Sequence, residues 1–464
     1  MSAGVGRRAL LAGAAAALAA PGFRRAEAAT GGAPSLEAIL AETGLAAVTG
    51  FAVAAMDGGP ELIESHDPAT GRPPASVAKL VTTLYALDAL GPDYRFRTRL
   101  LAAGPVEGGA LRGDLVLEGG GDPVLDTDGL AALAAGLRVA GIDRVEGRFL
   151  VAEGALPFVA DIARNQPEDA GYNPTISGIN LNFNRVQMRW APGSPPFFGA
   201  PGKTNVVPVS GITGRIAPGP IRHGFEPGRE VWSLPAARVR GEGSEWLPVR
   251  APAAYAGEVF AGLAGQSGLV LQRPEVVGRA AGATVALSDS PRLDRMLGDM
   301  LRFSTNLTAE AIGLRASQSR GLDPSGVAAS ASAMSAWARD RHGVETLALV
   351  DHSGLGDRSR VAAGEMVAIL RGAPALSGLL RRRPVGDLGA TVAAKTGTLF
   401  FASGLAGYLT GTRTLAFAIF ASDPALRARI RPEDRAQPAG SRGWTARARA
   451  QEQALLRRWA AVHA

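Results

Sequence analysis

A helical pattern of hydrophobic positions begins after the Pro73-Pro74 pair. Apolar residues recur there with the i, i+3, i+4, i+7 spacing that is typical of a helix with one buried face, and the run stops at Gly91. The apolar positions are Val77, Leu80, Val81, Leu84 and Leu87. This pattern predicts a helix that carries Ser76 in its first turn, with Lys79 three residues further on.

Alternating patterns typical of β-strands lie on both sides of this helix. Two strand-like runs precede it, in GLAAVTGFAVAAMDG and ELIESHD. Near the C-terminus, ASGLAGYL and TLAFAIFAS flank the short turn Thr410 to Arg413 and predict a hairpin. The basic amphipathic run TARARAQEQALLRRWAAV then predicts a terminal helix that packs Leu455, Leu456 and Trp459 on a sheet, the alternative being contact with an anionic membrane.

Residues 94–284 have a different character. They are rich in Gly, Pro and short β-like runs such as GDLVLEG, RFLVAEG and NRVQMRW, and only GLAALAAGLRVAG is clearly helical. A chain of 464 residues exceeds the roughly 250–300 residues at which a single core stops growing. We therefore expect at least two domains.

The composition excludes several classes of function. The formal net charge is +7, but the arginines are scattered and no basic run is interleaved with aromatic residues, so we expect no nucleic-acid partner. The absence of cysteine excludes disulfides and thiolate catalysis. The five histidines show no metal-ligand spacing, so we expect no metal and no other cofactor. His352, in DHSGLG, lies in a turn-rich segment that favours a backbone role over that of a catalytic base.

The N-terminus has the organisation of an export signal. Arg7 and Arg8 precede a short apolar run, and AEA ends at Ala28 as a cleavage site would. Residues 1–28 are thus predicted to be a signal peptide of either the twin-arginine or the general secretory type. The apolar run is far shorter than the ~20 residues that a spanning helix needs, so no transmembrane segment is expected after its removal.

Lysine is rare in this chain, and its positions are informative. Only three of the 49 basic residues are lysines, namely Lys79, Lys203 and Lys395. The predicted helix places Lys79 on the same face as Ser76, where a neutral amine could take the proton of the hydroxyl. Arginine cannot do this because its guanidinium stays protonated. The alternative is a surface lysine that follows a capping serine by chance.

The second unusual lysine lies on a predicted strand. Lys395, Thr396 and Gly397 form a K-T-G sequence within that strand. Gly397 would let a ligand approach the strand backbone closely, Thr396 and Thr398 offer hydroxyls, and Lys395 offers a cation for a substrate carboxylate. Lys203, in PGKTNVV, is expected on a surface loop.

A third short sequence, S-x-N, completes the set with Ser304 and Asn306 at the entrance to another predicted helix. In the order S-x-x-K, S-x-N, K-T-G, the chain resembles the active-site serine penicillin-recognising enzymes. Ser76 and Ser304 are 228 residues apart, an interval similar to that of the class C low-molecular-mass penicillin-binding proteins, the D-alanyl-D-alanine carboxypeptidase/endopeptidase family. The middle motif reads S-T-N here, where many members have S-D-N.

The resemblance implies an α+β fold in which helices flank an antiparallel sheet. Residues 29–93 and 285–464 would form this penicillin-binding domain, and residues 94–284 would be a β-rich insertion of two small domains. The expected partners are peptidoglycan stem peptides, with β-lactam antibiotics as inhibitors. The expected location is the periplasm.

The resemblance also implies a reaction on the D-Ala-D-Ala bond. Ser76 would attack the carbonyl with Lys79 as general base, Ser304 would pass a proton to the departing D-alanine, and Asn306 would hold the substrate amide and Lys79. The backbone N–H groups of Ser76 and Thr398 would form an oxyanion hole.

The terminal carboxylate would be bound by Lys395, Thr396 and Thr398, and no metal would take part. Two alternatives remain open at this point. The first is a serine β-lactamase, which the absence of an E-x-x-L-N-type segment and the size of the insertion disfavour. The second is a catalytically silent protein that binds cell-wall peptides.

Overall fold

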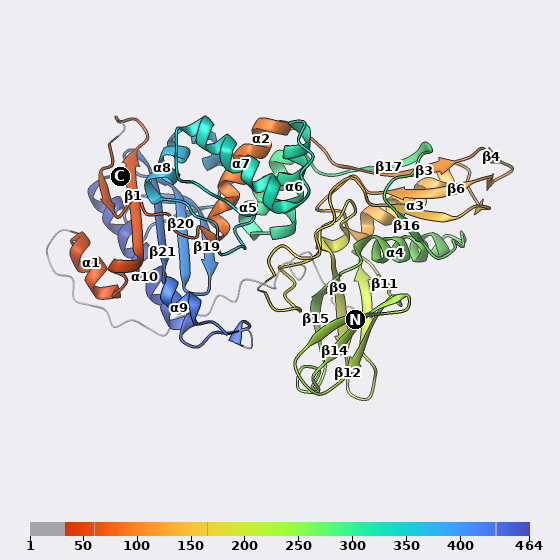
Figure 1. Cartoon of the computed structure of the whole chain (residues 1–464). Helices are drawn as coiled ribbons and strands as arrows, with labels where there is room; N and C mark the ends of the chain where they lie inside the picture. The colour runs from red at the N-terminus through yellow and green to blue at the C-terminus, as the bar shows by residue number, and fades with distance from the viewer. Residues whose placement is uncertain (1–32, 60, 165, 432–433) are drawn as a thin grey trace. The chain divides into compact units, whose positions relative to one another are not determined.

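The computed structural model describes residues 33–59, 61–164, 166–431 and 434–464, so the predicted signal peptide 1–28 lies outside the described residues. The described chain divides into two units. Figure 1 labels helices and strands of both. We call residues 33–88, 297–304 and 328–464 the sheet unit, and residues 89–296 and 305–327 the central unit.

The sheet unit is built on six strands in the order β18-β19-β20-β21-β1-β2, and every neighbouring pair is antiparallel. The two strands predicted before Ser76 are β1 and β2, and the predicted hairpin is β20–β21, so both predictions are confirmed. The strands are β1 (Thr49–Ala55), β2 (Glu64–His66), β18 (Arg382–Pro384), β19 (Thr391–Leu399), β20 (Ala402–Thr410) and β21 (Thr414–Ser422).

The C-terminal helix α10 (Ser441–Val462) packs on this sheet as the sequence predicts. Leu455, Leu456 and Trp459 are buried in one cluster with large apolar residues of β1, β20 and β21. Alternate positions of β21 are alanines such as Ala416 and Ala418, which point to the opposite face and are also buried. The other helices wholly or mostly in this unit are α1 (Leu36–Thr43), α2 (Lys79–Leu90), α5 (Leu293–Phe303), α7 (Val327–His342), α8 (Ala363–Arg371) and α9 (Pro424–Ala428).

The central unit contains four small sheets. A five-stranded sheet has the order β16-β8-β6-β3-β17, a four-stranded sheet β11-β10-β9-β15, and two three-stranded sheets β12-β14-β13 and β4-β5-β7. The first sheet consists of β3 (Arg97–Ala103), β6 (Asp114–Glu118), β8 (Phe149–Ala152), β16 (Glu275–Val277) and β17 (Ala283–Asp289). The second consists of β9 (Arg185–Trp190), β10 (Phe197–Pro201), β11 (Val206–Pro208) and β15 (Gly243–Pro248). The remaining strands are β4 (Val106–Glu107), β5 (Ala110–Leu111), β7 (Arg144–Val145), β12 (Ile212–Ile216), β13 (Arg222–Glu226) and β14 (Arg229–Leu234).

The chain enters and leaves the predicted insertion at the same place. The first strand of this stretch, β3, and β17, which begins at its end and continues to Asp289, are antiparallel neighbours, with Arg97 opposite Asp289. The backbone N–H of Ser290 donates to the carbonyl of Phe96 just beyond this pair. The two connections to the rest of the chain therefore lie side by side.

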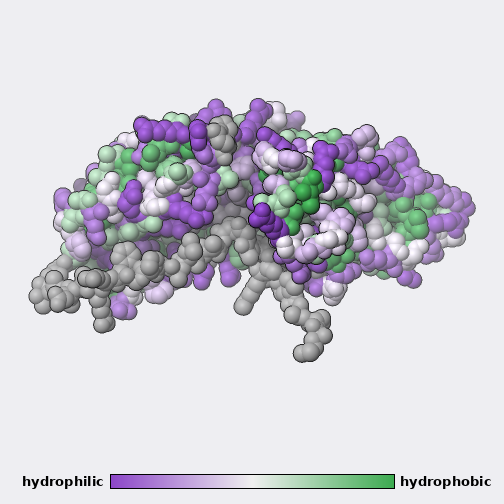
Figure 2. Space-filling view, turned by 90° about the horizontal axis from the view of Figure 1, so that it is seen from below, coloured by the Kyte–Doolittle hydropathy of each residue, from purple (hydrophilic) through white to green (hydrophobic). Residues whose placement is uncertain are grey.

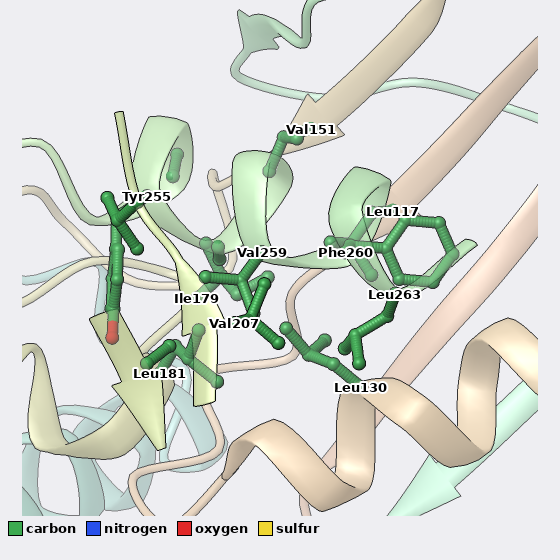
Figure 3. Packing of buried hydrophobic residues seen from close by; sticks show 14 of the residues in the cluster. Leu117, Leu130, Val151, Ile179, Leu181, Val207, Tyr255, Val259, Phe260 and Leu263 are labelled. Atoms are coloured by element: carbon green, nitrogen blue, oxygen red, sulfur yellow. The ribbon is translucent and has the colours of Figure 1, made fainter. Parts of the chain in front are cut away.

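A large hydrophobic cluster joins α3, several strands of the central unit and a helix that the sequence pattern did not reveal. Figure 3 shows side chains of α4 (Pro252–Gln266), including Val259 and Leu263, directed toward Leu130 of α3 (Thr127–Val139) and Val207 of β11. The prediction that only the α3 segment is helical in this region was therefore wrong. Glycines obscured α4, and Gly257 is needed there because a Cβ would lie 2.7 Å from Pro274 and Val151. Helix α6 (Asn306–Ser319) also belongs to the central unit.

Candidate active site

The S-x-x-K pair lies where a tight turn becomes a helix. Residues Ala75–Ala78 form a 3-10 turn, and α2 begins at Lys79. Side chains three residues apart eclipse one another in a 3-10 turn, so Lys79 lies over Ser76. The Nζ atom of Lys79 donates a hydrogen bond to Oγ of Ser76 at 3.0 Å. Lys79 is completely buried and Ser76 is half-buried, which leaves the hydroxyl accessible and removes water from the amine.

The turn that carries Ser76 is strained and closely held. Ala75 has a φ of 49°, in the left-handed region that favours glycine, directly before the candidate nucleophile. Gly354 packs so closely against it that a Cβ on the glycine would lie 1.8 Å from the Ala75 carbonyl oxygen. Such strain persists only where the surrounding structure fixes the backbone, which here is the segment 351–356.

Segment 351–356 supplies a second hydrogen-bond partner for Lys79, which the sequence did not predict. The carbonyl oxygen of Ser353 accepts a hydrogen bond from Lys79 Nζ at 2.7 Å. The carboxylate of Asp351 accepts from the backbone N–H groups of Gly354 and Gly356, which fixes the turn and aims this carbonyl. The Asp-x-x-Gly-x-Gly spacing indicates a tight turn, but nothing in it points to Lys79.

His352 has a structural position in this segment. Its ring nitrogen Nε2 lies 3.0 Å from Oγ of Ser330 on α7, and its carbonyl oxygen accepts from the Thr82 hydroxyl of α2 at 2.6 Å. The residue is fully buried. His352 therefore ties the segment to two helices of the sheet unit.

The K-T-G lysine faces the serine of the S-x-N motif. Nζ of Lys395 donates to Oγ of Ser304 at 3.0 Å and to the carbonyl oxygen of Thr396 at 2.7 Å. Burial lowers the pKa of Lys395 from 10.5 to about 8, because desolvation disfavours the ammonium. Ser304 lies between α5 and α6 and has a φ of 58°. The sequence assigned roles to both residues, but not this pairing.

Two glycines allow the turn of Ser76 to rest on the sheet. Gly397 of β19 and Gly404 of β20 are opposite each other. A Cβ on Gly397 would lie 2.5 Å from the carbonyl oxygen of Pro74 and 3.0 Å from the backbone nitrogen of Ser76. Gly397 was expected to admit a ligand to the strand backbone. In the structure the space that its missing Cβ leaves is filled by the turn that carries Ser76.

In the described chain, the second half of β19 has two exposed side chains and an unpaired edge. Thr396 and Thr398 are exposed, as expected for alternate residues that point away from the turn. Strand β18 pairs only with Thr391–Ala393, so no strand among the described residues pairs with the outer edge of β19 beyond that point. An extended peptide could therefore add to this edge through backbone hydrogen bonds.

Asn306, the last predicted catalytic residue, begins α6 in the central unit. Its side-chain Nδ2 donates to the carbonyl oxygen of Tyr172 at 2.9 Å. Tyr172 belongs to the stretch between β8 and β9, within the predicted insertion. The predicted insertion thus contributes a backbone contact to the S-x-N motif, which no sequence pattern indicates.

The described part of the chain contains neither a metal-binding cluster nor a membrane-spanning helix. There, no three acidic or histidine side chains come together as a metal site would require. Within the same residues, every helix is too short or too polar to cross a bilayer. On the face drawn in Figure 2, hydrophilic residues surround small, separate hydrophobic areas.

Known proteins share both the sequence pattern and the fold. The sequence profile of the D-Ala-D-Ala carboxypeptidase 3 (S13) family matches residues 33–381. A D-alanyl-D-alanine carboxypeptidase of Actinomadura sp. (strain R39) is 28% identical over 432 residues, which cover 83% of this chain and 79% of the relative.

The structural comparison gives the same fold. The crystal structure of penicillin binding protein 4 (dacB) from Haemophilus influenzae matches with a TM-score of 0.71 at 20% identity, covering 88% of this chain and 94% of the other. A second structure of that protein, complexed with a β-lactam, matches with a TM-score of 0.67 over the same shares. The predicted α+β fold with an antiparallel sheet is therefore confirmed.

Proposed function

The chain belongs to the D-Ala-D-Ala carboxypeptidase 3 (S13) family, and we propose that Ser76 is its nucleophile and Lys79 its general base. The protein is a serine-type D-Ala-D-Ala carboxypeptidase, a peptidoglycan hydrolase of the low-molecular-mass penicillin-binding class. The observation that carries the residue assignment is the 3.0 Å hydrogen bond between the buried Lys79 amine and the half-buried Ser76 hydroxyl. This is the arrangement that an activated serine requires.

The proposed first half-reaction forms an acyl-enzyme. Oγ of Ser76 attacks the carbonyl carbon of the D-Ala-D-Ala bond while Nζ of Lys79 takes the hydroxyl proton. The backbone N–H groups of Ser76 and Thr398 stabilise the oxyanion, a contribution of typically a few kcal/mol. The C–N bond then breaks, and Ser304 relays the proton held by Lys79 to the amine of the departing D-alanine, which leaves both side chains in their starting protonation states. Water afterwards hydrolyses the ester and restores Ser76.

Lys395, Thr396 and Thr398 are proposed to bind the terminal carboxylate of the substrate, and Asn306 to hold the substrate amide and Lys79. The open edge of β19 supports this proposal because it lies beside both exposed threonines. The contact of Lys395 with Ser304 gives the lysine a second role, since its charge lies beside the proposed proton carrier.

We also propose that the enzyme cleaves D-Ala-meso-diaminopimelate cross-links, since the chemistry is the same when a neighbouring peptide replaces the terminal D-alanine. The predicted insertion, 94–284, would position such long substrates, and residues 29–93 and 285–464 would form the penicillin-binding domain. The predicted signal favours action in the periplasm. Mass spectrometry of products from cross-linked muropeptides tests the substrate, and the N-terminal mass of the exported protein tests the cleavage after Ala28.

Fluorescent penicillin is expected to label the protein covalently at Ser76, because the β-lactam carbonyl meets the same nucleophile as the peptide. Gel fluorescence and peptide mapping measure the label. Ser76→Ala should abolish it, whereas Ser65→Ala, an exposed change on β2, should not. Rapid turnover of penicillin without a lasting adduct would instead favour a β-lactamase, and binding of peptides without acylation would favour a silent binding protein.

The activity is expected to fall as the pH rises through about 8, where Lys395 of the free enzyme loses its proton and can no longer bind the carboxylate. The profile of kcat/KM between about pH 6 and 10 measures this limb. Lys395→Arg should lower the activity but move the limb upward, because a guanidinium stays protonated. An unchanged alkaline limb in this variant would contradict the assignment.

Deprotonation of Lys395 does not itself destabilise the fold. The pKa of Lys395 is lower in the folded protein than its usual 10.5, so the unfolded chain binds more protons between about pH 8 and 10.5. The contribution of this group to the free energy of unfolding therefore rises with pH in that range, while the activity falls.

A further inference from the structure

Asn306 is held by a loop of the central unit. We call residues 160–164 and 166–175 the tyrosine loop, because its Tyr172 carbonyl oxygen accepts the 2.9 Å hydrogen bond from Nδ2 of Asn306. This bond fixes which end of the Asn306 amide is the donor and where it points. The position of the Tyr172 carbonyl therefore contributes to the orientation of a side chain for which we have proposed a role in the reaction.

The tyrosine loop has little regular structure of its own, and one guanidinium binds it at three points. Nη1 of Arg250 donates to the carbonyl oxygens of Ala160 and Asn173, both at 3.1 Å, and Nη2 donates to that of Glu168 at 2.9 Å. The planar guanidinium can make several such bonds at once because its donors form a fixed fork. Asn173, the residue next to Tyr172, is among the three.

Asn173 extends this order through the loop. Its side-chain oxygen accepts from the backbone N–H groups of Ile162 and Ala163, and its Nδ2 donates to the carbonyl of Ala163, each at 2.9 Å. The residue is only 2% exposed. Both ends of the loop are therefore joined to each other and to Arg250.

The backbone of Arg250 is held by a buried carboxylate. The carboxylate of Glu230, which is 3% exposed, accepts from the backbone N–H groups of Arg250 and Ala251, at 3.1 and 2.7 Å for Oε1. Glu230 lies on β14 and Arg250 follows β15, so the anchor belongs to the sheets of the central unit. The guanidinium thus connects a rigid part of this unit to the loop that holds Asn306.

We propose that Arg250 is a positioning residue for the reaction, which acts by fixing the tyrosine loop and through it the amide of Asn306. The inference rests on the proposed role of Asn306. It gives the insertion a defined influence on catalysis without placing any reacting group in it.

A double-mutant cycle tests the proposal. Arg250→Met removes the three donors and keeps an unbranched side chain, and is expected to lower the acylation rate with fluorescent penicillin and kcat/KM for a D-Ala-D-Ala peptide about tenfold. Asn306→Ala should lower both rates more strongly. In the Asn306→Ala background, Arg250→Met should change the rates less than about twofold, because the residue through which it acts is already absent. If Arg250 contributed to stability alone, Arg250→Met would lower the melting temperature. Its effect on the rates would then be the same with and without the Asn306 side chain.

Two further variants complete the design. Arg273→Met is the matched control, since Nη2 of Arg273 donates to the carbonyl of Gly228 elsewhere in the central unit, and its rates should stay within about twofold of the unaltered protein. Arg250→Lys keeps the charge but not the fork, so it should give an intermediate loss, and it replaces Arg250→Met in the cycle if that variant does not fold.

The outcomes distinguish a failure of the role of Arg250 from a failure of the proposed function. A tenfold loss on Arg250→Met that persists in the Asn306→Ala background overturns the role of Arg250 and leaves the proposed function intact. Unchanged rates for Asn306→Ala overturn the role of Asn306 and the present inference together, while labelling at Ser76 still tests the nucleophile independently.

Discussion

A Lys79→Arg variant is expected to lose acylation by fluorescent penicillin, with a rate about 10²–10⁴-fold below that of the unaltered protein, the range that general-base catalysis contributes. The guanidinium stays protonated and cannot accept the proton of Ser76. The substitution also has no space, because Lys79 is completely buried and its Nζ lies within hydrogen-bond distance of Ser76 Oγ and the Ser353 carbonyl. Stopped-flow or gel-based labelling under excess penicillin gives the rate.

The other two lysines are natural controls for the same change. The Lys203 side chain is 65% exposed and lies 3.5 Å from the carboxylate of Asp128, so Lys203→Arg should leave acylation unchanged. The acylation rate of Lys395→Arg should lie between the rates of Lys79→Arg and Lys203→Arg, since a guanidinium can still bind a carboxylate. Acylation of Lys79→Arg at the rate of the unaltered protein would refute the assignment of Lys79 as the base.

Gly397→Ala is expected to reduce acylation about a hundredfold, although the substitution adds one methyl group and removes no reacting atom. The new Cβ would lie 2.5 Å from the carbonyl oxygen of Pro74 and 3.0 Å from the nitrogen of Ser76, both of which are backbone atoms. The turn must therefore move, and with it the proposed nucleophile Ser76 and one N–H of the proposed oxyanion hole. We expect a loss of stability of about 1–3 kcal/mol as well, which is typical of overpacking.

The matched control is Gly443→Ala. This glycine lies in α10, is exposed, and would meet no atom within 4 Å through an added Cβ. Alanine favours a helix over glycine, so this variant should be slightly more stable and label normally. If Gly397→Ala labelled as fast as Gly443→Ala, the close contact between β19 and the turn of Ser76 would not matter for the reaction.

Local sequence signals were sufficient for the parts of the site that depend on neighbours in the chain. The spacing of Ser76 and Lys79 predicts their contact because three residues make one tight turn. The hairpin of β20 and β21 follows from alternation around a short turn, and the packing of Trp459 follows from the apolar face of its helix.

Contacts between segments that are distant in the chain had no local sequence pattern to predict them. Sequence reasoning assigned a ligand to Gly397, whereas the structure places the turn of Ser76 against it, because one missing Cβ serves either purpose equally well. The carbonyl of Ser353 could not be predicted, since any residue can supply a backbone oxygen. Helix α4 was missed because its glycines, of which Gly257 is required by close packing, resemble those of a loop.

The adjacency of β3 and β17 bears on the order in which the protein folds. β1 pairs with β21, so the sheet of the sheet unit cannot close until almost the whole chain has been synthesised. The stretch between Arg97 and Asp289 is continuous, and its end strands pair with each other. If this stretch folds first, it brings its own ends together, and the closure entropy of the later β1–β21 pairing corresponds to a much shorter loop. Pairing of β3 with β17 would then shorten the remaining conformational search, and a nascent chain would acquire protease resistance in its middle before either terminus is protected.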